Sequence, residues 1–153
     1  MKAIKSFFVL FAVSISLLFA APAAHAAKEI YTSTFSKKAL SGYDTVAYFT
    51  QGKPVKGTDN FKTEYKGAEW LFSSQANLDA FKANPEKYAP QYGGYCAYAV
   101  GKYNDLVSAD PEAWKIVNGK LYLNYDKDIQ AEWAANQSEY ITKGNANWPG
   151  LIK

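Results

Sequence analysis

The sequence predicts an α+β domain, in which a small antiparallel sheet built from two hairpins and a lone strand packs against two or three helices. Three observations support this class. Apolar and polar residues alternate through residues 61–72, on both sides of a turn. Asn118-Gly119, the strongest short hairpin signal, separates two further alternating segments. Apolar residues then recur at helical spacing through residues 129–141.

The first elements lie before and within the first hairpin. Residues 39–50 are expected to form a loop that runs into a short strand. The hairpin pairs residues 61–65 with residues 69–72, and it places the aromatic rings of Trp70 and Phe72 on one face because they are two residues apart.

A helix is expected directly after this hairpin. Ser73 or Ser74 can cap its start, and Leu78 and Phe81 share one of its faces. Pro85 ends it, and the preceding asparagine begins a short further turn of helix.

The rest of the chain supplies the lone strand, the second hairpin and a final helix. Residues 95–100 alternate after two glycines and are expected to be the lone strand. Asp126 or Asn124 can cap the final helix, and Gly144 is expected to end it. The tail around Trp148 is expected to pack against the body of the domain. We find no internal repeat in the sequence.

The N-terminus carries the pattern of a signal peptide. Lys2 and Lys5 precede an uncharged apolar run, and Ala24-His25-Ala26 is a cleavage site of the A-x-A type. The alternative is an uncleaved membrane anchor. We therefore expect an exported protein, periplasmic or secreted, with no stable membrane span after cleavage. A flexible arm over residues 27–38 and a single domain over residues 39–150 follow the signal peptide.

Composition excludes several functions once residues 1–26 are removed. The remaining 153 − 26 = 127 residues contain no His, no Met and no Arg, and their 15 Lys nearly balance 14 acidic residues. Catalytic Ser-His-Asp and Cys-His pairs are therefore excluded, as are histidine-based zinc sites. Nucleic acid is not an expected partner, because charge is near neutral and Arg is absent.

The single cysteine, Cys96, is the central candidate, and three interpretations of it remain open. It is a small buried residue, a reactive thiol, or a ligand to a metal ion or small molecule. Asp44 is a candidate second ligand or, alternatively, the cap of a turn. The candidate binding set is Cys96, Tyr43, Asp44, Tyr95, Tyr98, Gly93 and Gly94, with Cys96 and Asp44 as the candidate metal ligands. Copper or zinc is the candidate metal, and a homodimer could bring two Cys96 thiols together.

Two segments of the chain resemble the YHS domain. They are Tyr65-Lys-Gly-Ala-Glu-Trp-Leu-Phe-Ser-Ser74 and Phe81-Lys-Ala-Asn-Pro-Glu-Lys-Tyr88. The flanking segments 41–49, 88–97 and 118–125 are similar to an exported bacterial branch of that family, so that the resemblance covers roughly residues 39–150.

The resemblance implies a fold related to cysteine-rich metal-binding modules. In such modules cysteines stand near the positions of Ser73, Ser74 and Asn77, and the family name records a histidine that the chain lacks after residue 26. We therefore expect the chain to adopt the fold of this family but to lack its usual metal site. We expect a non-enzymatic binding module for a metal ion or small ligand centred on Cys96. A thiol redox protein and a structural or partner-binding domain are the alternatives.

Overall fold

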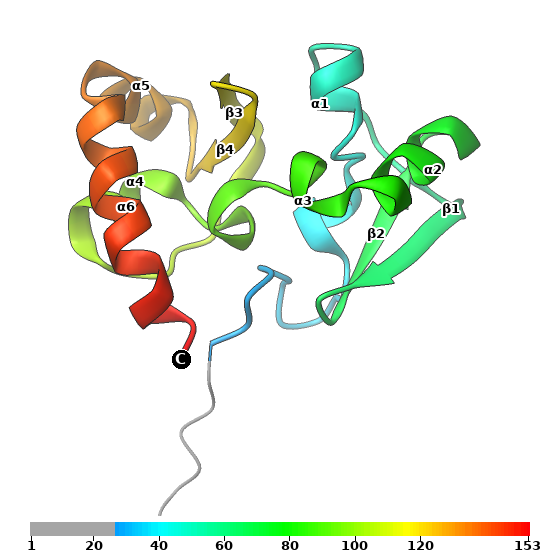
Figure 1. The fold of residues 1–153 in the computed structure, drawn as a ribbon, viewed down its shortest axis with the longest axis horizontal. Helices are drawn as coiled ribbons and strands as arrows, with labels where there is room; N and C mark the ends of the chain where they lie inside the picture. Colours follow the sequence, from blue (N-terminus) through cyan, green and yellow to red (C-terminus); the bar gives the residue numbers. More distant parts are fainter. Residues whose placement is uncertain (1–26) are drawn as a thin grey trace, which may run out of the picture.

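The computed structural model describes residues 27–153, so the predicted signal peptide lies outside the described part of the chain. Within it there are six α-helices, two short 3-10 helices and four strands (Figure 1). The strands form two separate two-stranded antiparallel sheets. The α+β class is confirmed, but the two hairpins do not join into one sheet and the helices are more numerous than expected. No helix of the described chain combines the length and the apolar character needed to cross a membrane.

The first half of the described chain folds around one hairpin. Its elements are η1 (Ala39–Gly42), α1 (Ala47–Thr50), β1 (Thr58–Tyr65), β2 (Ala68–Phe72), α2 (Gln75–Ala83) and α3 (Pro85–Tyr88). The predicted caps are confirmed, since Ser74 Oγ accepts from the N–H of Asn77 at 3.2 Å and Asn84 Oδ1 accepts from the N–H of Lys87 at 3.2 Å. These side chains satisfy N–H groups that a helix start leaves unpaired.

The second half folds around the other hairpin. Its elements are η2 (Gln91–Gly94), α4 (Ala97–Tyr103), β3 (Asp110–Val117), β4 (Lys120–Asn124), α5 (Lys127–Ala135) and α6 (Gln137–Leu151). The predicted turn is confirmed, because Asn118 and Gly119 have φ angles of 51° and 73°. The predicted cap of α5 is also confirmed, since Asp126 Oδ1 accepts from the N–H of Ile129 at 2.8 Å.

Two of the predicted strands are helical. The lone strand expected at residues 95–100 is instead the start of α4, and only Cys96 in it forms an isolated bridge, to Leu123. Every residue from Ala97 to Gly101 is buried, so apolar residues lie on all faces of the helix. The spacing of apolar residues therefore could not distinguish a helix from a strand in this segment. The strand expected within residues 39–50 is likewise replaced by α1.

The C-terminal region also differs from the prediction. The single expected helix is two helices, α5 and α6, which meet at Asn136. Gly144 does not end a helix but lies inside α6, where a Cβ atom would stand 2.6 Å from the hydroxyl oxygen of Tyr92. Glycine is therefore needed there for close packing. Trp148 packs against the body as expected, with its ring centroid 5.8 Å from that of Tyr92.

The two halves repeat one another at a constant spacing of 52 residues, so the expectation of no internal repeat is wrong. Adding 52 to the bounds of β1 and β2 gives those of β3 and β4, and the same shift carries α2 onto α5. Both hairpins have their irregularity at the same place. It falls after the pair Thr58–Phe72 in the first hairpin and after the pair Asp110–Asn124 in the second.

Backbone conformation repeats as well, although the sequence barely does. The φ angles of 47°, 51° and 81° at residues 40–42 are matched by 54°, 59° and 86° at residues 92–94. Only nine of the 49 pairs formed by residues 40–88 and 92–140 are identical. These pairs are Gly42/Gly94, Tyr43/Tyr95, Ala47/Ala99, Val55/Val107, Gly67/Gly119, Leu71/Leu123, Ala83/Ala135, Asn84/Asn136 and Tyr88/Tyr140. The repeat is therefore a property of the backbone and core, and side-chain chemistry has diverged over it.

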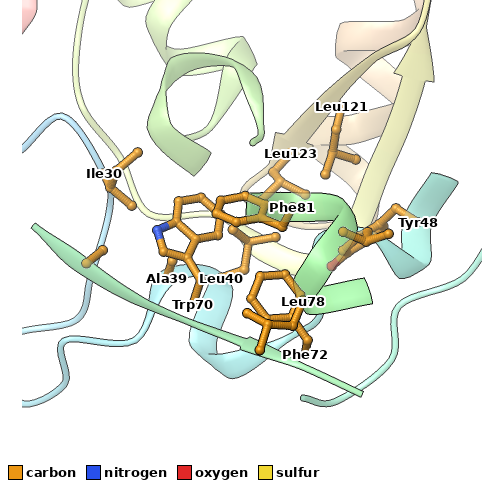
Figure 2. Packing of buried hydrophobic residues seen from close by; sticks show 12 residues of the cluster. Ile30, Ala39, Leu40, Tyr48, Trp70, Phe72, Leu78, Phe81, Leu121 and Leu123 are labelled. Atoms are coloured by element: carbon orange, nitrogen blue, oxygen red, sulfur yellow. The ribbon is translucent and has the colours of Figure 1, made fainter. Parts of the chain in front are cut away.

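Strand β4 joins the two halves through the core. In the first cluster the aromatic rings of Trp70 and Phe81 lie together, and Leu121 and Leu123 of β4 belong to the same cluster (Figure 2). Tyr122, between those two leucines, packs in the second cluster. Because successive strand residues point to opposite faces, β4 contributes to both cores and holds the halves together.

Residues in the segment expected to be a flexible N-terminal arm contact both halves. Ile30 is buried in the first cluster. The N–H of Tyr31 donates to the carbonyl of Gly93 at 2.9 Å, and the N–H of Glu69 donates to the carbonyl of Lys37 at 2.8 Å. The segment therefore lies across the junction between the halves.

Candidate functional site

A cavity of about 340 Å³ opens beside Cys96 in the second half. Its wall includes Cys96, which precedes α4, and Ala99 within that helix. Val107 contributes from the following loop, Tyr125 from the segment before α5, and Ile129 from α5 itself. Carbon atoms make up most of this wall. Cys96 is 1% exposed and belongs to the second buried cluster, and it borders the cavity from within that cluster.

Polar groups and large rings complete the lining. The hydroxyl of Tyr98 donates to Glu132 Oε2 at 2.6 Å, and the ammonium of Lys102 donates to the same hydroxyl. The hydrogen bond with Glu132 raises the pKa of Tyr98, and the hydrogen bond with Tyr98 raises the pKa of Lys102. Tyr103 and Tyr125 are 62% and 52% exposed. The cavity thus has two exposed aromatic rings and one hydrogen-bonded carboxylate among its lining groups.

The sulfur of Cys96 lies among hydrogen-bonding groups. Its thiol donates to Asn124 Oδ1 at 3.9 Å, and the same oxygen accepts from the N–H of Tyr98 at 3.2 Å. Burial raises the pKa of the Cys96 thiol, and nearby backbone N–H groups partly oppose the rise. The protonated thiol is therefore the dominant form near neutral pH.

The equivalent place in the first half, 52 residues earlier, is filled by a polar network. Asp44 Oδ2 accepts from the N–H of Ser73 at 2.8 Å, from Ser73 Oγ at 2.7 Å and from Asn77 Nδ2 at 2.7 Å. The counterparts of Asp44, Ser73 and Asn77 are Cys96, Tyr125 and Ile129. Three side chains that close the first half by hydrogen bonding are thus replaced by three that line a cavity in the second half.

Asp44 acts as a cap, as one of its two interpretations proposed. Its Oδ1 accepts from the N–H of Val46 at 2.9 Å and from the N–H of Ala47 at 3.2 Å, at the start of α1. Together with the contacts of Oδ2, five hydrogen bonds reach this fully buried carboxylate. Its oxygens hold the first half together.

The neighbouring candidate Tyr43 also lies away from the cavity. Its hydroxyl donates to Glu112 Oε1 at 3.3 Å, and the ammonium of Lys56 stands 3.8 Å from its ring centroid. Desolvation and the negative charge of Glu112 raise the pKa of Tyr43. Neither Tyr43 nor Asp44 lines the cavity beside Cys96.

The candidates Gly93, Gly94 and Tyr95 face other parts of the chain. A Cβ atom at Gly93 would stand 1.7 Å from the carbonyl oxygen of Glu29, so the close approach that this glycine permits is made by the protein's own N-terminal segment. The hydroxyl of Tyr95 donates to the carbonyl of Lys28 at 3.0 Å. Gly94 has a φ angle of 86° and serves the turn into Cys96. Of the expected set, Cys96 and Tyr98 line the cavity.

The donors at the cavity do not fit a metal ion. Cys96 and its proposed partner Asp44 hold equivalent places in different halves and share no hydrogen-bonding neighbour. No group of three or more His, Cys, Asp or Glu side chains in residues 27–153 is arranged to hold a metal. Copper and zinc prefer several thiolate or imidazole ligands, whereas the cavity offers one thiol and a carboxylate already bound to a tyrosine.

Sequence reasoning missed most of the cavity wall. Ile129 was expected on the apolar face of the last helix, Tyr125 was considered only as part of the resembling segment 118–125, and Val107 was given no role. Asn124 was considered only as a helix cap, yet it is fully buried and contacts the sulfur. The spacing of 52 residues was the signal that could have found Tyr125 and Ile129, by aligning them with Ser73 and Asn77.

Comparison with known proteins agrees with the architecture of the first half. The family described as the YHS domain matches the chain over residues 46–92. This match runs from α1 to the start of η2, and includes the positions of Ser73 and Asn77 but not Cys96. Neither the curated proteins nor the solved structures contain a match to the chain.

Proposed function

Since the chain carries a YHS domain at residues 46–92, we propose that the protein is an exported binding module whose second half takes up a small, largely apolar molecule in the cavity beside Cys96. The observation that carries this proposal is the replacement of the Asp44 network by a cavity at the equivalent position. The first half provides a closed scaffold, and the second half provides the binding site.

The size and lining of the cavity define the class of ligand. An apolar cavity of about 150 Å³ is enough to bind benzene, so 340 Å³ accommodates a molecule with two rings. The carbon-rich wall and the exposed rings of Tyr103 and Tyr125 favour an aromatic or alicyclic body. Sites for small molecules commonly combine such a wall with a few fixed polar groups.

One polar contact sets the expected orientation of the ligand. The carboxylate of Glu132 accepts from Tyr98, and it retains capacity to accept a second hydrogen bond. A ligand with a hydroxyl or N–H group at one end can donate to it while its apolar body lies against Ile129 and Ala99. A compound that is anionic at this end is disfavoured by the charge of Glu132.

A fragment screen by protein-detected NMR tests this proposal. Indole, naphthol and a cyclohexanol are added to isotope-labelled protein beginning at residue 27, and the amide shifts of Ala99, Val107 and Ile129 are followed. The proposal requires shifts at these residues that saturate with at least one fragment. Shifts scattered over the surface, or none at the cavity, would reject it.

Two variants place the same bulky side chain in different positions on α5. In Ile129→Trp the indole fills the cavity and is expected to abolish binding. In Ala131→Trp it lies at an exposed position of the helix and leaves binding unchanged. Loading with copper and zinc, followed by metal analysis of wild type and Cys96→Ser, serves as the comparison; a metal retained only by the wild type would contradict an organic ligand.

A further inference from the structure

Two helices border the cavity beside Cys96, and each carries an apolar residue and a charged residue on one face. On α4, Ala99 lines the cavity and Lys102 follows it by three positions. On α5, Ile129 and Glu132 both line the cavity and have the same spacing. Residues three positions apart are neighbours on the surface of a helix. Each helix therefore adds a charge, of opposite sign to the other, next to the apolar wall.

The hydroxyl of Tyr98 joins these two charges. It donates to Glu132 Oε2 at 2.6 Å and accepts from the ammonium of Lys102. That ammonium stands 4.6 Å from the ring centroid of Tyr98 and 5.3 Å from that of Tyr103, another residue of the cavity wall. The cation and the carboxylate are thus separated by one oxygen atom, beside the cavity.

Both charges retain capacity to bind a ligand. Tyr98 takes one of the three donors of the Lys102 ammonium and binds one oxygen of the Glu132 carboxylate. Within residues 27–153, neither of these two charged side chains forms an ion pair. A molecule that carries an ammonium and a carboxylate close together can therefore contact Glu132 and Lys102 at the same time, through charge-assisted hydrogen bonds.

The first half lacks this arrangement at the equivalent positions. Three uncharged side chains stand where the second half has the two charges and the hydroxyl that joins them. They are Val46, Thr50 and Ala80, each 52 residues before Tyr98, Lys102 and Glu132. The fold that both halves share therefore does not require the charged pair, and the pair accompanies the cavity.

We propose that this cavity binds the zwitterion of an aromatic α-amino acid, whose ammonium contacts Glu132 and whose carboxylate contacts Lys102. The inference rests on the proposed function and adds the chemical class of the ligand's polar end. The aromatic ring lies against Ile129, in a volume of about 340 Å³ that accommodates the two fused rings of an indole. An α-amino acid carries its two charges on adjacent carbon atoms, which matches the close spacing of the two protein charges.

Four ligands with the same indole body test this proposal by calorimetric titration. Indole has no charge, tryptamine has only the ammonium, indole-3-propionate has only the carboxylate, and tryptophan has both. Tryptophan should bind at least about tenfold more tightly than indole, and more tightly than either singly charged ligand, because each of those meets one like charge. If indole binds and tryptophan binds no more tightly, this proposal is overturned and the proposed function stands. If none of the four binds, both are overturned.

Two variants assign the contacts to residues, and both are expected to fold because the side chains concerned are exposed. Glu132→Gln keeps an acceptor for Tyr98, and it should weaken the binding of tryptamine and strengthen that of indole-3-propionate. Lys102→Gln keeps a donor to the same hydroxyl and should have the opposite effects.

Both variants should weaken the binding of tryptophan at least about fivefold and leave the binding of indole unchanged. Lys120→Gln provides the control, since Lys120 is exposed in the same half and does not line the cavity; it should leave all four affinities unchanged. Tryptophan affinities that are the same in wild type, Glu132→Gln and Lys102→Gln would contradict the assigned contacts.

Discussion

Replacement of Asp44 by alanine should be much more destabilising than replacement of its counterpart Cys96. The Asp44→Ala variant removes the acceptor of five hydrogen bonds. It leaves the N–H of Val46 as a buried donor, and the N–H of Ser73 and the amide of Asn77 as partly buried donors. Each buried donor left without a partner costs about 1–3 kcal/mol. The buried donor of Val46 and the two partly buried donors together predict a loss of about 3–5 kcal/mol in the free energy of unfolding.

The Cys96→Ala variant provides the comparison within the same fold. It removes one sulfur atom from the wall of a cavity and one weak hydrogen bond. A cost of about 1 kcal/mol is expected, typical of a small truncation. Asp44→Asn keeps the shape of the side chain and loses its charge. Its loss in the free energy of unfolding should be about 2 kcal/mol, between those of Asp44→Ala and Cys96→Ala.

Urea unfolding followed by tryptophan fluorescence measures all three variants on one scale. The slope of the transition with urea should stay constant, since the surface exposed on unfolding does not change. An Asp44→Ala cost below about 1 kcal/mol, or equal costs for Asp44→Ala and Cys96→Ala, would refute the assignment of a scaffold role to the first half and a binding role to the second.

Three further predictions concern the turns, the buried tyrosines and export. Gly119→Ala should lower the free energy of unfolding by about 1 kcal/mol, because alanine disfavours the positive φ at this position. Gly93→Ala should lower it clearly more, because the added Cβ would stand 1.7 Å from the carbonyl oxygen of Glu29. Equal losses of the two variants in urea unfolding would contradict this contact. Burial raises the pKa of Tyr48 above its ordinary value of 10.0, so the stability that the protonated hydroxyl contributes is complete below pH 10.0 and is lost as the pH rises further. The urea midpoint of Tyr48→Phe should therefore decline less at alkaline pH than that of wild type. Equal declines in the two proteins would contradict this prediction. The secreted protein should begin at Ala27 by intact-mass analysis, and a retained N-terminus would instead support the membrane anchor.

The elements that the sequence predicted correctly are those with local causes. The Asn118-Gly119 turn is set by the left-handed conformation that these two residues adopt readily. Ser74 and Asp126 cap helices through their own side chains, so each boundary could be located without knowledge of the fold. The α+β class followed from these local signals.

The elements that were missed depend on tertiary packing. Residues 97–101 are buried on every side, so their pattern of polarity could not distinguish a helix from a strand. Gly144 was interpreted as a helix end, whereas the hydroxyl of Tyr92 requires it inside a helix. In both cases the decisive neighbours lie far away along the chain.

The repeat and the site were hidden by divergence of side chains. Asp44 and Cys96 have no chemistry in common, and neither do Asn77 and Ile129, so equivalent positions did not align by residue type. Composition alone identified Cys96 as the central residue. The cavity beside it arises because Tyr125 and Ile129 leave open the space that Ser73 and Asn77 close, which requires knowledge of both halves.

The rate at which a small, uncharged alkylating reagent modifies Cys96 in the folded protein tests the central claim most directly, since that claim places the sulfur at the wall of an accessible cavity. The account predicts measurable modification of the wild type under native conditions, at least about tenfold slower modification of Ile129→Trp, and an unchanged rate in Ala131→Trp. Modification that occurs only when the protein unfolds, or at one rate in all three proteins, would contradict it.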